Sequence, residues 1–377
     1  VLLQEMIFYH GTLLRSHGRI GAVSVSLSIQ AIVGGLAGLA LLWPFGVWGL
    51  LAGWLIGQVG ALLYIRREGA AVAPLAIVPN AGTRQLLVRG FPIFIFLATT
   101  TLLKSIDRIM ILKYLSVEAL GYYSIGLMGV SMLLYLPESI AYVLYPRLIA
   151  RYAENGDAGR TARDMVRPLA AVAWLMPLII GTSVFWVREL VLLFLPEYLP
   201  GVRALSTLLF GALGLALAVI PSFYLMSIRR QMQLVPLALA AVVVDIVLIL
   251  VFLRAGARID GVALAVTLGN AAYGLGLLAF AAIHAVPTLR ERVAFVTRSA
   301  LPSLLTVVLC VSLFTWVRPL IVPQAAGWIS SAILSVLFLA LYAFMARRLK
   351  PSTGIASMLR TSSWPFARML AGVWTRD

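Results

Sequence analysis

The chain has 377 residues, of which 62% are hydrophobic and only 12% are charged, and its mean hydropathy is +0.99. A soluble domain cannot bury that much apolar surface, so the composition predicts a protein that crosses the membrane many times. The single cysteine excludes a disulfide framework, and the three histidines show no metal-ligand spacing, so no metal site is predicted.

Apolar runs of about 20 residues, the length that crosses the hydrocarbon core, recur along the whole chain. The first run is partial, and Val1–Tyr9 reads as the end of a helix, which predicts that the N-terminal part of a longer protein is missing. Runs without alternation cannot be barrel strands, so an all-α fold is predicted. The ten full spans predicted are 20–42, 46–65, 91–114, 120–145, 168–187, 203–226, 233–253, 261–284, 299–317 and 327–346.

The basic residues between these spans follow the positive-inside rule. When the connections are assigned alternately to two sides, 22 of the 30 Lys and Arg residues lie on one side and six on the other. The remaining two lie within a span. The basic side, which includes a connector at 151–167 and the tail at 349–377, is therefore predicted to be cytoplasmic. No nucleic-acid partner is needed to explain this charge, because orientation and contact with anionic membrane lipids account for it.

Two segments of the chain, 48–63 and 260–275, resemble each other at an offset of 212 residues. The matched pairs are Gly49 with Gly261, Gly57 with Gly269, and Gln58 with Asn270. Both segments run from the outer to the inner side, so a parallel duplication of six-helix units is predicted. Close packing of the spans 20–42 and 46–65 is also predicted, from Gly34, Gly35 and Gly38 on the first and Gly53 and Gly57 on the second.

The span 91–114 carries three charges, Lys104, Asp107 and Arg108. A charge at the bilayer centre costs about 2.5–3.5 kcal/mol on insertion scales, so these side chains are expected to face protein or a watery cavity. Lys104 and Arg108 are four residues apart and therefore share a face of the helix.

Two interpretations of these charges remain open from the residues alone. In the first, Lys104, Asp107 and Arg108 form a buried ion-pair network with Asp245, which lies at a similar depth in its own span. Glu138 is the poorer candidate for this network, because it lies nearer the cytoplasmic end of its helix. In the second, at least one cation faces a central cavity and binds an anion.

Several stretches resemble the Wzx-type flippases for lipid-linked oligosaccharides, which belong to the MATE-like multidrug/oligosaccharidyl-lipid/polysaccharide superfamily. The resemblance is carried by "IDRIMILKYLSVEALGYYSIGLMGV" (106–130), "VLYPRLIARY" (143–152) and the region 241–268. It extends over essentially the whole chain. One departure is Asp245, where the family usually has Asn, and this leaves the role of that position open.

The resemblance implies two six-helix bundles followed by two further helices, with a cytoplasmic C-terminus. On this basis residues 1–67 are the end of a truncated N-terminal bundle and 86–285 the second bundle. Residues 298–348 are then the two added helices, and 349–377 the cytoplasmic tail.

The resemblance also implies a function. The substrate is expected to be a polyprenyl-pyrophosphate-linked oligosaccharide, moved by alternating access from the cytoplasmic to the outer leaflet of the bacterial inner membrane for polysaccharide export. Lys104 and Arg108 are expected to bind the headgroup, with Asp107, Asp245 and Glu138 as a charge network. A polysaccharide polymerase and chain-length proteins are the expected protein partners.

The alternative functions are a multidrug or ion-coupled exporter, a lipid II flippase of the same superfamily, and an enzyme. An exporter of cations would favour buried acids over buried bases. An enzyme is not expected, because no paired carboxylates, HExxH or GxSxG pattern is present. No phosphate-binding loop is present either, so we expect no cofactor and no direct use of ATP.

Overall fold

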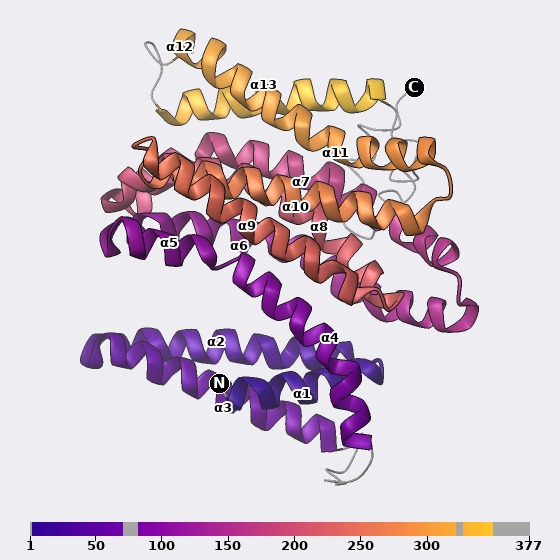
Figure 1. Ribbon diagram of the computed structural model, residues 1–377. Helices are drawn as coiled ribbons and strands as arrows, with labels where there is room; N and C mark the ends of the chain where they lie inside the picture. The colour runs from indigo at the N-terminus through magenta and orange to yellow at the C-terminus, as the bar shows by residue number, and fades with distance from the viewer. Residues whose placement is uncertain (1, 71–81, 322–326, 350–377) are drawn as a thin grey trace. The chain divides into compact units, whose positions relative to one another are not determined.

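The computed structural model describes residues 2–70, 82–321 and 327–349, which are almost entirely helical (Figure 1). Within these ranges, nine helices are long and apolar enough to cross a membrane. The predicted all-α, multi-pass membrane fold is therefore confirmed. Contacts divide the chain into two compact units, Val1–Gln85 and Leu86–Asp377.

The first unit contains α1 (Leu2–Ser16), α2 (Ile20–Phe45) and α3 (Val47–Ala70), and α2 packs along α3 as a tight hairpin. Glycines on both helices set their separation. A Cβ atom at Gly57 would lie 2.6 Å from the Cα of Gly34, and one at Gly53 would overlap the backbone of Gly38. The predicted close approach of these helices is thus confirmed, since no larger side chain fits between them.

The second unit is a bundle whose central helix, α8, is surrounded by α6, α7 and α10 (Figure 1). Its principal helices are α4 (Gly82–Leu103), α5 (Ile106–Tyr114), α6 (Val117–Asn155), α7 (Ala158–Phe194), α8 (Val202–Ser227), α9 (Gln231–Arg254) and α10 (Ile259–Ala285), with a short 3₁₀ turn η1 (Pro196–Gly201) before α8. Small residues let α8 and α10 approach closely: a Cβ atom at Gly214 would overlap the backbone of Asn270.

The last helices of the second unit pack on α7. They are α11 (Leu289–Ser312), the π-helical turn η2 (Leu313–Val317), α12 (Arg318–Ile321) and α13 (Gly327–Leu349). Phe338 of α13 fits against Gly181 of α7, and the Tyr342 hydroxyl donates to the carbonyl of Trp174 at 2.8 Å. Aromatic packing and this buried hydrogen bond therefore attach α13 to the bundle.

The two hairpins linked by the sequence repeat pack in the same way. Gly49 and Gly57 of α3 face the preceding helix, α2. In the same way, Gly261 of α10 faces the C-terminal end of α9 and Gly269 faces the α9 helix. In the first unit, backbone atoms of α2 fill the space beside Gly57. In the second, the carboxylate of Asp245 fills the space beside Gly269.

The structure differs from the ten predicted spans at the connector 151–167 and at the span 91–114, which is not among the nine candidate helices of the described residues. The connector expected at 151–167 is helical except at Gly156 and Asp157. Hydropathy falls where the charged residues begin, but α6 and α7 both continue into this region. Gly156, with φ of 63°, terminates α6, and Asp157 caps α7 by accepting from the backbone N–H groups of Gly159 and Arg160. The second difference is a break within the span 91–114. Of the predicted tail at 349–377, residues 350–377 lie outside the described residues.

Candidate functional site

The charged span is two helices, and the break between them falls at Lys104 and Ser105. The last turn of α4 closes through Lys104 N–H to the carbonyl of Thr100 at 3.1 Å and Ser105 N–H to that of Leu102 at 3.0 Å. The α5 helix then begins at Ile106. Neither Pro nor Gly lies at the break, so nothing in the local sequence predicts it.

The break explains the order of the charges. A helix carries partial negative charge at its C-terminus and partial positive charge at its N-terminus. Lys104 follows the last residue of α4, and Asp107 lies in the first turn of α5, so each charge complements its helix end. A continuous helix would have offered neither stabilisation.

Asp107 is a fixed part of the site. It is only 3% exposed, and its two carboxylate oxygens accept hydrogen bonds at 2.8 Å, one from the Tyr123 hydroxyl of α6 and one from the backbone N–H of Arg108. The carboxylate therefore holds the start of α5 against α6.

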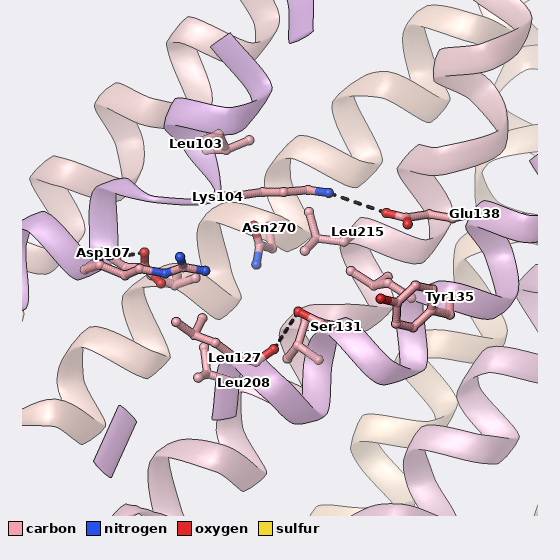
Figure 2. Close-up of a pocket in the computed structure, with 14 residues that line it drawn as sticks. Leu103, Lys104, Asp107, Leu127, Ser131, Tyr135, Glu138, Leu208, Leu215 and Asn270 are labelled. Carbon is pink, nitrogen blue, oxygen red and sulfur yellow. Dashed lines mark hydrogen bonds and ion pairs between the residues drawn. The ribbon is translucent and has the colours of Figure 1, made fainter. Parts of the chain in front are cut away.

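A cavity of about 280 Å³ opens beside the break, between α4, α5, α6, α8 and α10 (Figure 2). Its polar lining is formed by Lys104, Asp107, Arg108, Ser131, Tyr135, Glu138 and Asn270, and its apolar lining by Leu103, Leu127, Val130, Leu134, Leu208, Leu215 and Val266. All of these residues belong to the second unit. The structure thus places both cations singled out from the sequence at a single cavity.

Lys104 reaches across this cavity to α6. Its Nζ lies 3.5 Å from Oε1 of Glu138, and the two side chains are 52% and 34% exposed (Figure 2). Arg108, also exposed, forms no salt bridge with any acid in the described ranges. The pair is therefore accessible, and the guanidinium is available to a ligand.

The expected pairing of Lys104 with Asp245 is wrong. Asp245 is fully buried in α9 against Gly269, does not line the cavity, and its two oxygens have no hydrogen-bond partner among the described residues. Glu138, the poorer candidate by depth, is the partner. Similar depth along two helices does not decide the partner, because a lysine side chain extends over about one helical turn and can reach a carboxylate at another level.

One part of the cavity lining is polar but uncharged, and we call it the uncharged wall. It consists of Ser131 and Tyr135 on α6 and Asn270 on α10, and Tyr135 is 69% exposed. Sequence reasoning missed this wall. The signal that could have revealed it is the spacing of Ser131, Tyr135 and Glu138, which lie four and three residues apart and so share one face of α6.

No group of three or more His, Cys, Asp or Glu side chains in the described parts of the chain could hold a metal ion. The lining of the cavity offers instead two cations, two partnered carboxylates, a phenol, a hydroxyl and a carboxamide. Such a site suits an anion joined to a neutral polar group.

Comparison with known proteins relates the chain to one protein family and to a solved structure. Residues 1–151 match the family described as polysaccharide biosynthesis protein. Among solved structures, the chain is similar to "Lipid II flippase MurJ, inward closed conformation", with a TM-score of 0.62 and 13% identity, covering 92% of this chain and 72% of that chain. At that identity the second match shows the fold alone. No curated protein matches the chain. The first match agrees over residues 1–151 with the resemblance drawn from the sequence motifs, and the second agrees with the expected fold.

Proposed function

We propose that this chain, a MATE-like member of the polysaccharide and lipid-linked flippases, moves polyprenyl-pyrophosphate-linked oligosaccharide repeat units from the cytoplasmic to the outer leaflet. The observation that carries the proposal is the cavity at the α4–α5 break, where Lys104 and Arg108 face the same space within an apolar bundle. The setting is the bacterial inner membrane, the C-terminus is cytoplasmic, and the product serves polysaccharide export.

The physical task of such a protein is to replace water around an anion. A pyrophosphate carrying sugars cannot cross hydrocarbon unaided, because its charges would lose their hydration. An ammonium and a guanidinium supply charge-assisted hydrogen bonds in place of that water, and the guanidinium can bind phosphate through two N–H groups at once. The polyprenyl tail stays in the bilayer while alternating access exposes the cavity to one side and then to the other.

The uncharged wall suits the sugar that follows the pyrophosphate. Ser131 and Asn270 offer hydrogen bonds to hydroxyl groups, and Tyr135 offers an exposed ring and a phenol. A volume of about 280 Å³ is near the lower end of small-molecule sites. It accommodates the pyrophosphate and the nearest sugar, so the rest of the oligosaccharide must lie beyond these residues.

The test is complementation of a host from which the gene has been deleted. In the deletion strain, lipid-linked repeat units should accumulate on the inner leaflet, and the intact gene should restore export. Lys104→Ala/Arg108→Ala should not restore export although the protein accumulates normally. Lys113→Ala, which removes an exposed cation of the same α5 helix outside the cavity, is the matched control and should restore it. Full export by the double variant would refute the proposal.

A lipid II flippase is the second candidate, favoured by the fold similarity to MurJ. Its substrate also contains a pyrophosphate, so Lys104 and Arg108 would bind that group in the same way, and only the attached sugars would differ. Accumulation of a peptidoglycan precursor, and not of an exopolysaccharide repeat unit, in the deletion strain would identify it. A multidrug exporter of cations is less well supported, because the cavity acids Asp107 and Glu138 both have partners already.

A further inference from the structure

The two acids of the cavity differ in how firmly they are held. Asp107 is buried and accepts two hydrogen bonds at 2.8 Å, so it cannot leave without a large cost. Glu138 is one-third exposed, and the contact that it makes is the 3.5 Å ion pair with Lys104. An exposed pair of this kind contributes about 0.2–1 kcal/mol, so it breaks readily.

From this difference we infer that Glu138 is an internal counter-ion, which occupies Lys104 while the cavity is empty and is displaced by the phosphate of an arriving headgroup. The inference rests on the proposed function. Its physical basis is that a pyrophosphate carries more negative charge than one carboxylate and can contact Lys104 and Arg108 together. The exchange therefore favours the headgroup. While the cavity is empty, Glu138 neutralises the ammonium of Lys104, which would otherwise have no counter-charge in the bundle.

The position of the pair gives the exchange a structural effect. Lys104 lies at the break between α4 and α5, and Glu138 lies in the middle of the long helix α6. The ion pair therefore ties the end of α4 to α6. Once phosphate has taken the ammonium, Glu138 and the bound anion repel each other, and the tie between the two helices is lost. Binding of the headgroup thereby loosens α4 at a break where small changes in backbone torsions redirect a whole helix.

The experiment measures binding to the purified protein in lipid nanodiscs. The probe is farnesyl pyrophosphate, with farnesol as the tail-only control and inorganic pyrophosphate as the headgroup-only control. Three variants are compared with wild type: Glu138→Gln, Lys104→Gln and the double variant. Glu138→Gln should bind farnesyl pyrophosphate about two- to five-fold more tightly, because the competitor is gone. Lys104→Gln should bind it more weakly.

The double variant separates competition from simple structural support. If Glu138 acts by occupying Lys104, its replacement should have no effect once Lys104 is absent, so the double variant should bind like Lys104→Gln. Glu138→Ala removes the same charge from a partly exposed side chain and replaces the Gln variant if that protein does not accumulate.

The possible failures are distinguishable. Unchanged or weaker binding by Glu138→Gln, with Lys104→Gln still weakened, would overturn the counter-ion role alone. Equal binding of farnesyl pyrophosphate and farnesol by wild type, with no effect of Lys104→Gln, would instead overturn the proposed headgroup site. Equal gains in tightness for Glu138→Gln in the presence and absence of Lys104 would also refute the exchange, since they would show a general effect of charge.

Discussion

The Tyr123 hydroxyl donates a hydrogen bond to the carboxylate of Asp107 at 2.8 Å, and both side chains are buried in the interior of the bundle. This contact joins α6 to the start of α5 and so fixes the position of Arg108, the next residue. Tyr123→Phe removes the donor and leaves a buried carboxylate oxygen unsatisfied, which costs about 1–3 kcal/mol. We expect a lower melting temperature for the purified protein, measured by scanning fluorimetry in detergent.

The matched control for that variant is the preceding residue. The Tyr122 hydroxyl also donates a hydrogen bond to a carboxylate, that of Glu118 one helical turn earlier, but this bond is exposed to solvent. Tyr122→Phe should leave the melting temperature almost unchanged, because water replaces the lost donor. Equal losses in the two variants would contradict the role given to the buried pair.

Arg108 tests whether the geometry of the cation matters as well as its charge. Arg108→Gln should lower export about ten-fold or more, since charge-assisted hydrogen bonds contribute about 1.5–3 kcal/mol. Arg108→Lys keeps the charge but loses the planar fork, so it should fall between Gln and wild type. The measurement is the amount of surface polysaccharide per amount of protein in the complemented deletion strain. Equal export by Lys and Gln variants would show that charge at this position is irrelevant.

Tyr135 tests the uncharged wall. Tyr135→Ala should lower export of the repeat unit several-fold while leaving the affinity for farnesyl pyrophosphate unchanged, because that probe has no sugar. Tyr114→Ala, which removes an exposed tyrosine outside the cavity, is the control and should change neither quantity. A parallel loss of probe binding by Tyr135→Ala would place the ring beside the phosphates and not beside the sugar.

Gly269 tests the packing of α9 on α10. A Cβ at this position would overlap Oδ1 of Asp245, so Gly269→Ala must displace that carboxylate or separate the helices, at a cost of about 1–3 kcal/mol. Asp245→Ala in the same chain should recover much of the loss by vacating the space. The readout is the melting temperature in detergent. Gly121→Ala in α6, where a Cβ meets open space, should cause no loss.

The sequence was sufficient to predict an all-α membrane fold and to single out the two cations, and the reasons are physical. The bilayer sets both the length of a span and the high cost of a charge inside it, so apolar runs and isolated charges are strong signals. Lys104 and Arg108 were found on this basis, and the structure brings them to one cavity. The predicted span 91–114 is instead divided between α4 and α5, and it is not among the nine helices of the described residues that could cross a membrane.

What escaped prediction depends on contacts between distant residues. The break after Leu103 has no Pro or Gly to mark it, and beside it Asp107 accepts a hydrogen bond from Tyr123, 16 residues away. The choice of Glu138 over Asp245 likewise depends on which helix face meets the cavity. Hydropathy gives no information about the rotation of a helix about its axis.

The length of α6 and α7 has a practical consequence for experiments. Helices of 39 and 37 residues measure about 58 and 55 Å, nearly twice the thickness of the hydrocarbon core of about 30 Å. Their joined ends around Gly156 and Asp157 carry the Arg151–Asp164 ion pair, and we expect them to project beyond the hydrocarbon core as a stalk. An antibody fragment or fluorescent label attached there would report on which side of the membrane the stalk projects. It would also provide a fiducial mark for imaging a small protein otherwise hidden in lipid.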